Sequence, residues 1–188
     1  MLAEKKERVI LGIDPGTAVM GYGIILEKGN KMELLSLGVV KLNQLDDHFL
    51  KLQRIFEKTM GLIENYKPDA LAIEAPFYAK NVQVTLKLGR AQGICMAAAL
   101  SKNIPVTEYA PRKIKQSITG KGTATKEQVA AMLQRLLNFK ETPEYLDATD
   151  GLAVAVCHSF QKISTSGGKS KTYTGWEAFV SDNKKRVK

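Results

Sequence analysis

The chain has 188 residues, of which 44% are apolar and 25% charged, a composition typical of one folded, soluble domain with its own core. A formal net charge of +9 indicates a polyanionic partner, and no window approaches the roughly 20 apolar residues of a membrane span. The charged N-terminus lacks the apolar stretch of a signal peptide, so we expect a cytoplasmic protein. Cys95 and Cys157 each lie among small apolar residues, which predicts buried thiols rather than a disulfide framework or a zinc site.

In chain order, the sequence begins with β-strands and then alternates strands with helices. Apolar runs bounded by turn residues predict strands at residues 9–14, 21–26, 34–42, 70–73 and 105–109. A Gly-Asn pair at residues 29–30 suits a hairpin turn between the second and third strands. Apolar spacings of three or four, together with capping signals, predict helices at residues 45–63, 81–100, 125–136 and 142–160.

This order of elements predicts an α/β fold, a mixed five-stranded sheet with helices on both faces. The first three strands are expected to be antiparallel, and the helix-linked later strands parallel. We assign residues 1–161 to this domain. Residues 162–188 carry seven Lys or Arg against Glu177 and Asp182 and include a Ser/Gly/Lys-rich run, which indicates a flexible basic extension.

Four acidic residues lie where such a fold would gather them. Asp14 and Glu74 each end a predicted strand, and strand ends are where α/β sheets display functional side chains. Asp147 and Asp150 are three residues apart, so a helix places both on one face. Each acid also has an ordinary interpretation, as a turn residue, a solvated side chain or a residue favoured near a helix start. None of these interpretations predicts acids at all three locations.

Carboxylates that converge require a counter-charge, and a divalent metal is the usual one. We predict Mg²⁺, with Mn²⁺ as a substitute, as two ions per site roughly 4 Å apart, an arrangement suited to phosphodiester cleavage. Asp14 is the natural shared ligand. The Asp-Pro-Gly-Thr turn at residues 14–17 is also similar to the phosphate-binding turn of sugar kinases and actin-like ATPases. Those proteins require a second large domain, for which this chain is too short.

Three sequence blocks carry a resemblance to a known family. They are Gly-Ile-Asp-Pro-Gly-Thr with Gly-Tyr-Gly (residues 12–17 and 21–23), Ala-Ile-Glu with Phe-Tyr-Ala-Lys-Asn (72–74 and 77–81), and Asp-Ala-Thr-Asp-Gly-Leu-Ala-Val-Ala (147–155). In this order they resemble the RuvC family of bacterial Holliday-junction resolvases, over about residues 8–161. The resemblance implies an RNase H-like fold and a homodimer that binds a four-way DNA junction. It also implies paired, symmetric nicks that leave 5′-phosphate and 3′-hydroxyl ends during recombination and repair, and partnership with a RuvA/RuvB-like branch-migration motor.

The resemblance assigns roles to individual residues as well. The four metal-binding catalytic acids of the family are matched by Asp14, Glu74, Asp147 and Asp150. Phe77 matches an aromatic residue that stacks on an unpaired base near the crossover, and Lys115 and Lys126 match lysines near the DNA phosphates. The expected DNA-binding set is completed by Lys80 in the second block and, by charge alone, Arg112, Lys113 and Lys121.

The predicted helix at residues 81–100 has Gly89 and Gly93 four residues apart, which allows a close helix approach inside the domain or across a dimer. The family resemblance favours the dimer. Two other functions remain open at this point. One is a related RNase H-fold nuclease that acts on RNA, and residues 77–81 speak against it. The other is a catalytically silent junction-binding module, which would require the loss of one of the four acids.

Overall fold

The computed structural model describes residues 7–76, 81–139 and 146–166, and a five-stranded sheet forms its centre. The strands are β1 (Glu7–Asp14), β2 (Val19–Lys28), β3 (Lys31–Lys41), β4 (Ala70–Glu74) and β5 (Val106–Tyr109). They lie in the order β3-β2-β1-β4-β5, with antiparallel pairing from β1 to β3 and parallel pairing of β1 with β4 and of β4 with β5. The predicted mixed sheet is therefore confirmed.

Strands β1 and β4 end at the same edge of this sheet. Their parallel pairing aligns Ile13 with Ile73, and both side chains are completely buried. The next residue of each strand is an acid, Asp14 in β1 and Glu74 in β4. Parallel pairing therefore brings these two acids to one edge, although 59 residues of sequence lie between them.

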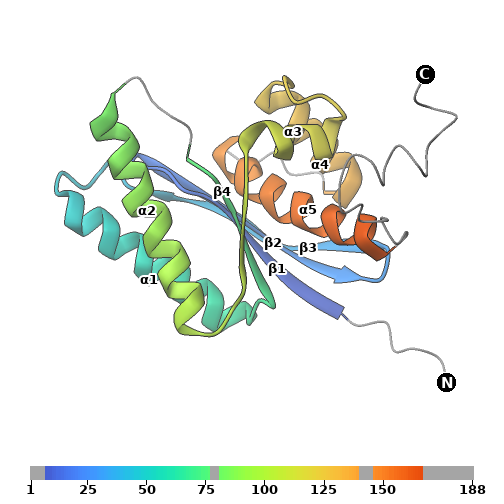
Figure 1. Ribbon diagram of the computed structural model, residues 1–188, viewed down its shortest axis with the longest axis horizontal. Helices are drawn as coiled ribbons and strands as arrows, with labels where there is room; N and C mark the ends of the chain where they lie inside the picture. The colour runs from blue at the N-terminus through green and yellow to red at the C-terminus, as the bar shows by residue number, and fades with distance from the viewer. Residues whose placement is uncertain (1–6, 77–80, 140–145, 167–188) are drawn as a thin grey trace, which may run out of the picture.

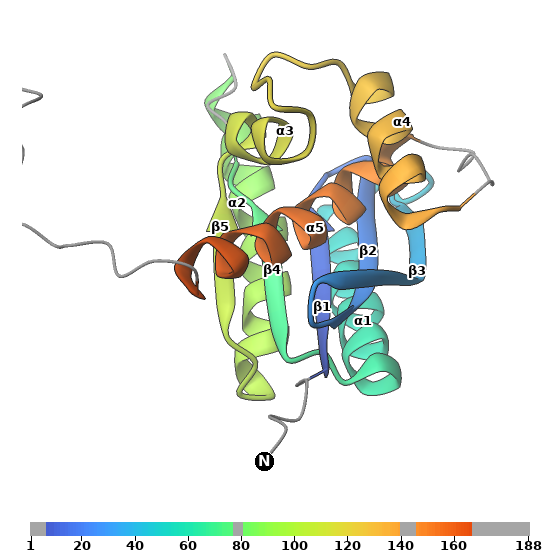
Figure 2. The ribbon, with the colours of Figure 1, turned by 90° about the vertical axis from the view of Figure 1, so that its right-hand side faces the viewer.

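Five helices cover the two faces of the sheet (Figures 1 and 2). One face is covered by α1 (His48–Tyr66) and α2 (Val82–Ser101), and the other by α3 (Pro111–Thr119), α4 (Lys126–Leu137) and α5 (Leu146–Ser166). Each layer has its own buried apolar cluster, with Ile55 and Cys95 in the first and Leu133 and Leu152 in the second. Among the helices that the structure describes, none is long and apolar enough to cross a membrane.

The helix boundaries follow local capping chemistry. Helix α1 begins at His48 rather than Leu45, because the Asp47 side chain accepts a hydrogen bond from the Leu50 N–H. The capping box predicted at Thr125 and Gln128 is present at the start of α4. The predicted start of the last helix at Thr142 lies outside the described residues, and α5 is described from Leu146.

Helix α3 was not predicted from the sequence, so the expected order of elements was incomplete. It has nine residues, and Ile114 and Ile118 are its buried side chains. Pro111 occupies its first turn, and no side chain caps its N-terminus. A helix with so short an apolar pattern and no capping residue gives little sequence signal, and packing against α5 and α4 stabilises it instead.

Helix α5 lies unusually close to β1 and β2 because glycines line the contact. A Cβ atom at Gly12 would collide with the backbone of Gly151 and Ala155, and one at Gly23 with Leu152. Gly21 in turn faces the backbone carbonyl of Asp147. The first turns of α5, which carry two acids, thus lie directly on β1 and β2, next to the acidic edge.

Candidate active site

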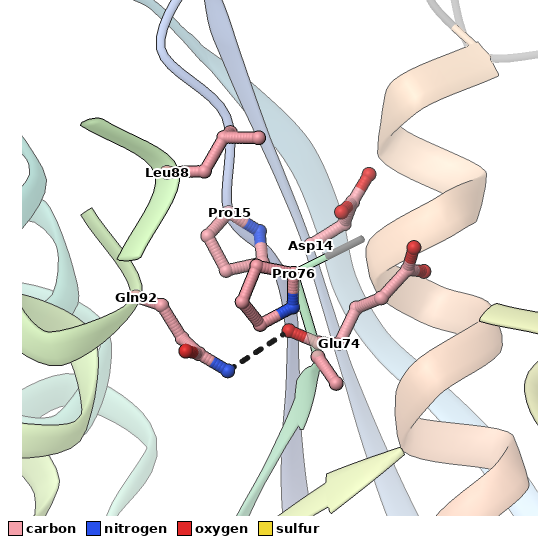
Figure 3. Close-up of a pocket in the computed structure, with 7 residues that line it drawn as sticks. Asp14, Pro15, Glu74, Pro76, Leu88 and Gln92 are labelled. Atoms are coloured by element: carbon pink, nitrogen blue, oxygen red, sulfur yellow. Dashed lines mark hydrogen bonds between the residues drawn. The ribbon is translucent and has the colours of Figure 1, made fainter. Parts of the chain in front are cut away.

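The carboxylates of Asp14 and Glu74 point to the same side of the sheet edge. Figure 3 shows both side chains directed towards α5, while Pro15, Pro76 and Leu88 lie on the opposite side, towards α2. Because Asp14 and Glu74 end neighbouring strands, their backbone positions are fixed by the sheet and only the side chains remain adjustable.

Helix α5 contributes the second pair of acids. Asp14, Glu74 and Asp150 line one cavity of about 360 Å³, together with Lys115 of α3 and Lys126 of α4. Asp147 lies one turn before Asp150 on α5, and its carboxylate accepts a hydrogen bond from the Lys126 ammonium at 3.0 Å. The structure therefore brings the four predicted acids to one place from three elements of the fold.

The crowding of these acids changes how they ionise. Burial, followed by repulsion from Asp150, raises the pKa of Asp14 to about 7. Burial and the charges of Asp14 and Asp150 raise the pKa of Glu74 to about 8. Both values lie well above the ordinary 3.8 and 4.5 of these side chains. Negative charge at this edge is therefore only partly compensated by the protein itself.

The ammonium of Lys126 neutralises part of this negative charge. Its ammonium forms ion pairs with both Asp147 and Asp150, whose side chains are 37% and 15% exposed. Burial alone would lower the pKa of Lys126, but the hydrogen bonds from its ammonium to Asp150 and Asp147 outweigh burial and raise it. The expected place of Lys126 near DNA phosphates stays a prediction, and the structure adds its contacts with two of the acids.

Within the described residues, no group of three His, Cys, Asp or Glu side chains is close enough together to hold a metal ion as it stands. The donor set nevertheless fits a hard divalent cation, because it consists of carboxylate oxygens and because the raised pKa values of Asp14 and Glu74 indicate too little positive charge to keep all four acids ionised. Asp14, Glu74, Asp147 and Asp150 are the residues that would hold such a cation.

The predicted basic residues separate into two groups. Lys115 and Lys126 line the acidic cavity. Arg112 and Lys113 are exposed on α3 and Lys121 on the loop after it, away from the cavity lining. Phe77 and Lys80 lie outside the described residues, so their DNA-binding roles stay predictions.

One polar contact at the site was missed by the sequence interpretation. Gln92 of α2 is buried, and its side-chain amide donates a hydrogen bond to the backbone carbonyl of Glu74 at 3.2 Å (Figure 3). It tethers the end of β4 to α2. A glutamine among the small and apolar residues 91–95 was the available signal, since a buried amide needs a partner.

The fold and its acidic edge define the class of RNase H-like α/β proteins with a carboxylate site. The family model for crossover junction endodeoxyribonuclease RuvC matches residues 10–158. A protein of that name from Christiangramia forsetii is 56% identical over 98% of this chain and 95% of its own length. One from Bacteroides fragilis is 54% identical over the whole of both chains.

The chain belongs to the RuvC family of crossover junction endodeoxyribonucleases, which are metal-dependent hydrolases. Its structure is also similar to that of Thermus thermophilus RuvC in complex with a Holliday junction substrate. The TM-score is 0.78 at 33% identity, covering 85% of this chain and 97% of that one. The RNase H-like fold expected from the sequence is confirmed.

Proposed function

We propose that this protein is a Holliday-junction resolvase, an endonuclease that nicks four-way DNA junctions during recombination and repair. The observation that carries the proposal is that Asp14, Glu74 and Asp150 line one cavity, with Asp147 joined to it through Lys126, in a chain of this family. A DNA substrate supports a cytoplasmic location, which we propose for this activity. The products we propose have 5′-phosphate and 3′-hydroxyl ends.

The four acids would hold two Mg²⁺ ions, or Mn²⁺ in their place. Bound there, divalent cations supply an activated water and neutralise charge that develops on the cleaved phosphodiester. Asp14 ends the central strand β1 beside β4 and faces α5, so it is placed to serve both ions. Deprotonation of Asp14 and Glu74, whose pKa values are about 7 and 8, accompanies cation binding.

The chain's basic groups would bring DNA to this acidic edge. Lys115 lies on the cavity wall beside Glu74, where an ammonium can contact the phosphate to be cleaved. Arg112, Lys113 and Lys121, further from the cavity, would contact neighbouring phosphates, and we propose the same role for Lys80. Phe77 would stack on a base that is unpaired at the junction centre. These contacts favour branched DNA over linear duplex, because only a junction presents opened bases and converging backbones together.

Paired nicks require two copies of the site, and we propose a homodimer formed through α2. Open space surrounds Gly89 and Gly93, since no described atom lies within 4 Å of a Cβ built at either. Val82 and Leu86 on the same helix are 68% and 50% exposed. An exposed apolar helix with small residues suits a two-fold contact, which would give two equivalent sites for two equivalent strands. A RuvA/RuvB-like branch-migration motor is the further partner we propose.

Replacement of Asp14 by Asn tests this function directly. The variant removes one carboxylate but keeps the size of the side chain, so we expect junction binding close to that of the wild type. Cleavage in Mg²⁺ should fall by at least about a hundredfold, because the shared ligand is lost. Gel-shift titration and cleavage of the same labelled four-way junction measure the two effects. Full cleavage by Asp14→Asn would contradict the assignment of the site.

A further inference from the structure

We propose that Lys126 is a resident counter-cation: its ammonium occupies the cation position between Asp147 and Asp150 until a divalent cation displaces it. The inference rests on the metal site of the proposed function. It goes further by assigning to Lys126 a place in the order of events, in which cation loading releases the lysine towards DNA.

Lys126 lies at the position that a cation bound by Asp147 and Asp150 would take. Lys126 is the first residue of α4, and Asp147 and Asp150 lie on the first turns of α5, so the contact joins two helix starts. The Lys126 ammonium is 3.0 Å from the Asp147 carboxylate and is bonded to the Asp150 carboxylate as well. One compact positive charge shared by two carboxylates stands where a cation ligated by the same oxygens would have to stand.

The hydrogen-bonding groups of Lys126 are largely used by the acids. A lysine ammonium has three N–H groups and no acceptor. Two of its contacts go to Asp147 and Asp150, which leaves at most one N–H group for a DNA phosphate. The acids and a phosphate therefore compete for this ammonium. Binding of a divalent cation to the acids selects the phosphate.

The Lys126 side chain can move without disturbing α4. Its side chain is 47% exposed, and α4 is held independently by its capping box at Thr125 and Gln128 and by buried Val129 and Leu133. Lys115 lines the same cavity and serves as a matched comparison, since it acts on Glu74 through its charge and the structure gives it no ion pair with the acids. If nearby positive charge alone weakens cation binding, removal of either lysine should strengthen it. If the Lys126 ammonium occupies the cation position, removal of Lys126 should strengthen it far more than removal of Lys115.

The test is Mn²⁺ binding to the full-length, DNA-free protein, followed by electron paramagnetic resonance of free Mn²⁺. Lys126→Met removes the charge but keeps the length of the side chain, and we expect it to bind Mn²⁺ about tenfold more tightly than the wild type. Lys126→Arg keeps the charge and should stay within about twofold of the wild type. Lys115→Met should gain less than about threefold.

A second measurement guards against a folding defect. In EDTA, Lys126→Met should melt at a lower temperature than the wild type, and Mn²⁺ should raise its melting temperature by more. Unchanged or weaker Mn²⁺ binding by Lys126→Met, or an equal gain by Lys115→Met, would overturn the proposal. Asp150→Asn distinguishes this failure from that of the metal site itself. If Asp150→Asn binds Mn²⁺ as well as the wild type does, the metal site is wrong and the inference falls with it.

Discussion

Asp14 and Glu74 connect the protonation state of the site to the stability of the protein. Burial and mutual repulsion raise their pKa values to about 7 and about 8 in the folded chain, against 3.8 and 4.5 ordinarily. A carboxyl whose pKa rises on folding takes up a proton as the chain folds, between its ordinary and its folded pKa. Without metal, these two carboxyls therefore destabilise the folded state least at low pH. The free energy of unfolding falls as pH rises from the ordinary to the folded pKa values.

The corresponding prediction concerns Glu74→Gln in EDTA. The neutral amide removes the cost of ionising Glu74, so the variant should become more stable relative to the wild type as pH rises from about 5 to 8. The advantage should reach about 3 kcal/mol at pH 8. Thermal unfolding followed by circular dichroism at a series of pH values measures it. If the difference in stability between the two proteins is the same at every pH, ionisation of Glu74 does not destabilise the folded state.

At the scale of the elements, glycines decide where the second pair of acids lies. Gly12 and Gly23 allow the α5 backbone to lie on β1 and β2, and Gly151 allows the same contact from the side of the helix. Any side chain at these positions would push α5 away from the sheet. The absence of side chains there therefore determines how close Asp147 and Asp150 lie to Asp14.

Gly23→Ala should lower stability and activity together. The new Cβ would meet the Leu152 backbone, which cannot rotate away, so we expect a loss of about 1–3 kcal/mol in the free energy of unfolding. Gly61→Ala on α1 is the control, because open space surrounds that position and a helical alanine should add up to about 1 kcal/mol. Urea denaturation compares the two. Equal stability of both variants would contradict the close seating of α5.

Much of this arrangement was predictable from the sequence, and the exceptions have physical causes. All five strands were predicted because each is an apolar run bounded by turn residues, and Asp14 and Glu74 were located because they end such runs. Helix α3 escaped prediction because its nine residues hold a single pair of buried isoleucines, and one repeat of helical spacing is too short to identify a helix. The ion pairs of Lys126 escaped because they join residues 21 and 24 positions apart, and only packing of α4 on α5 brings these together.

At the scale of the whole molecule, the chain has a net charge of +9, although its candidate active site consists of acids. Helix α5 continues to Ser166, so a truncation that spares it removes residues 167–188, which hold six Lys or Arg and two acids. Removing them should weaken junction binding mainly at low salt, because counterion release and long-range attraction fade as ionic strength rises. Affinity measured over a range of salt concentrations should show a shallower slope for the truncated chain. An unchanged slope would leave this segment without a role in DNA binding.

The central claim is that a metal site at the acidic edge cuts branched DNA. The most direct measurement is cleavage of a labelled synthetic four-way junction beside a linear duplex and an RNA–DNA hybrid, each with Mg²⁺ and with EDTA. We predict paired, symmetric nicks in the junction alone, only with Mg²⁺, and products that a ligase reseals. Cleavage in EDTA, or preferential cutting of the hybrid or of linear duplex, would contradict the account.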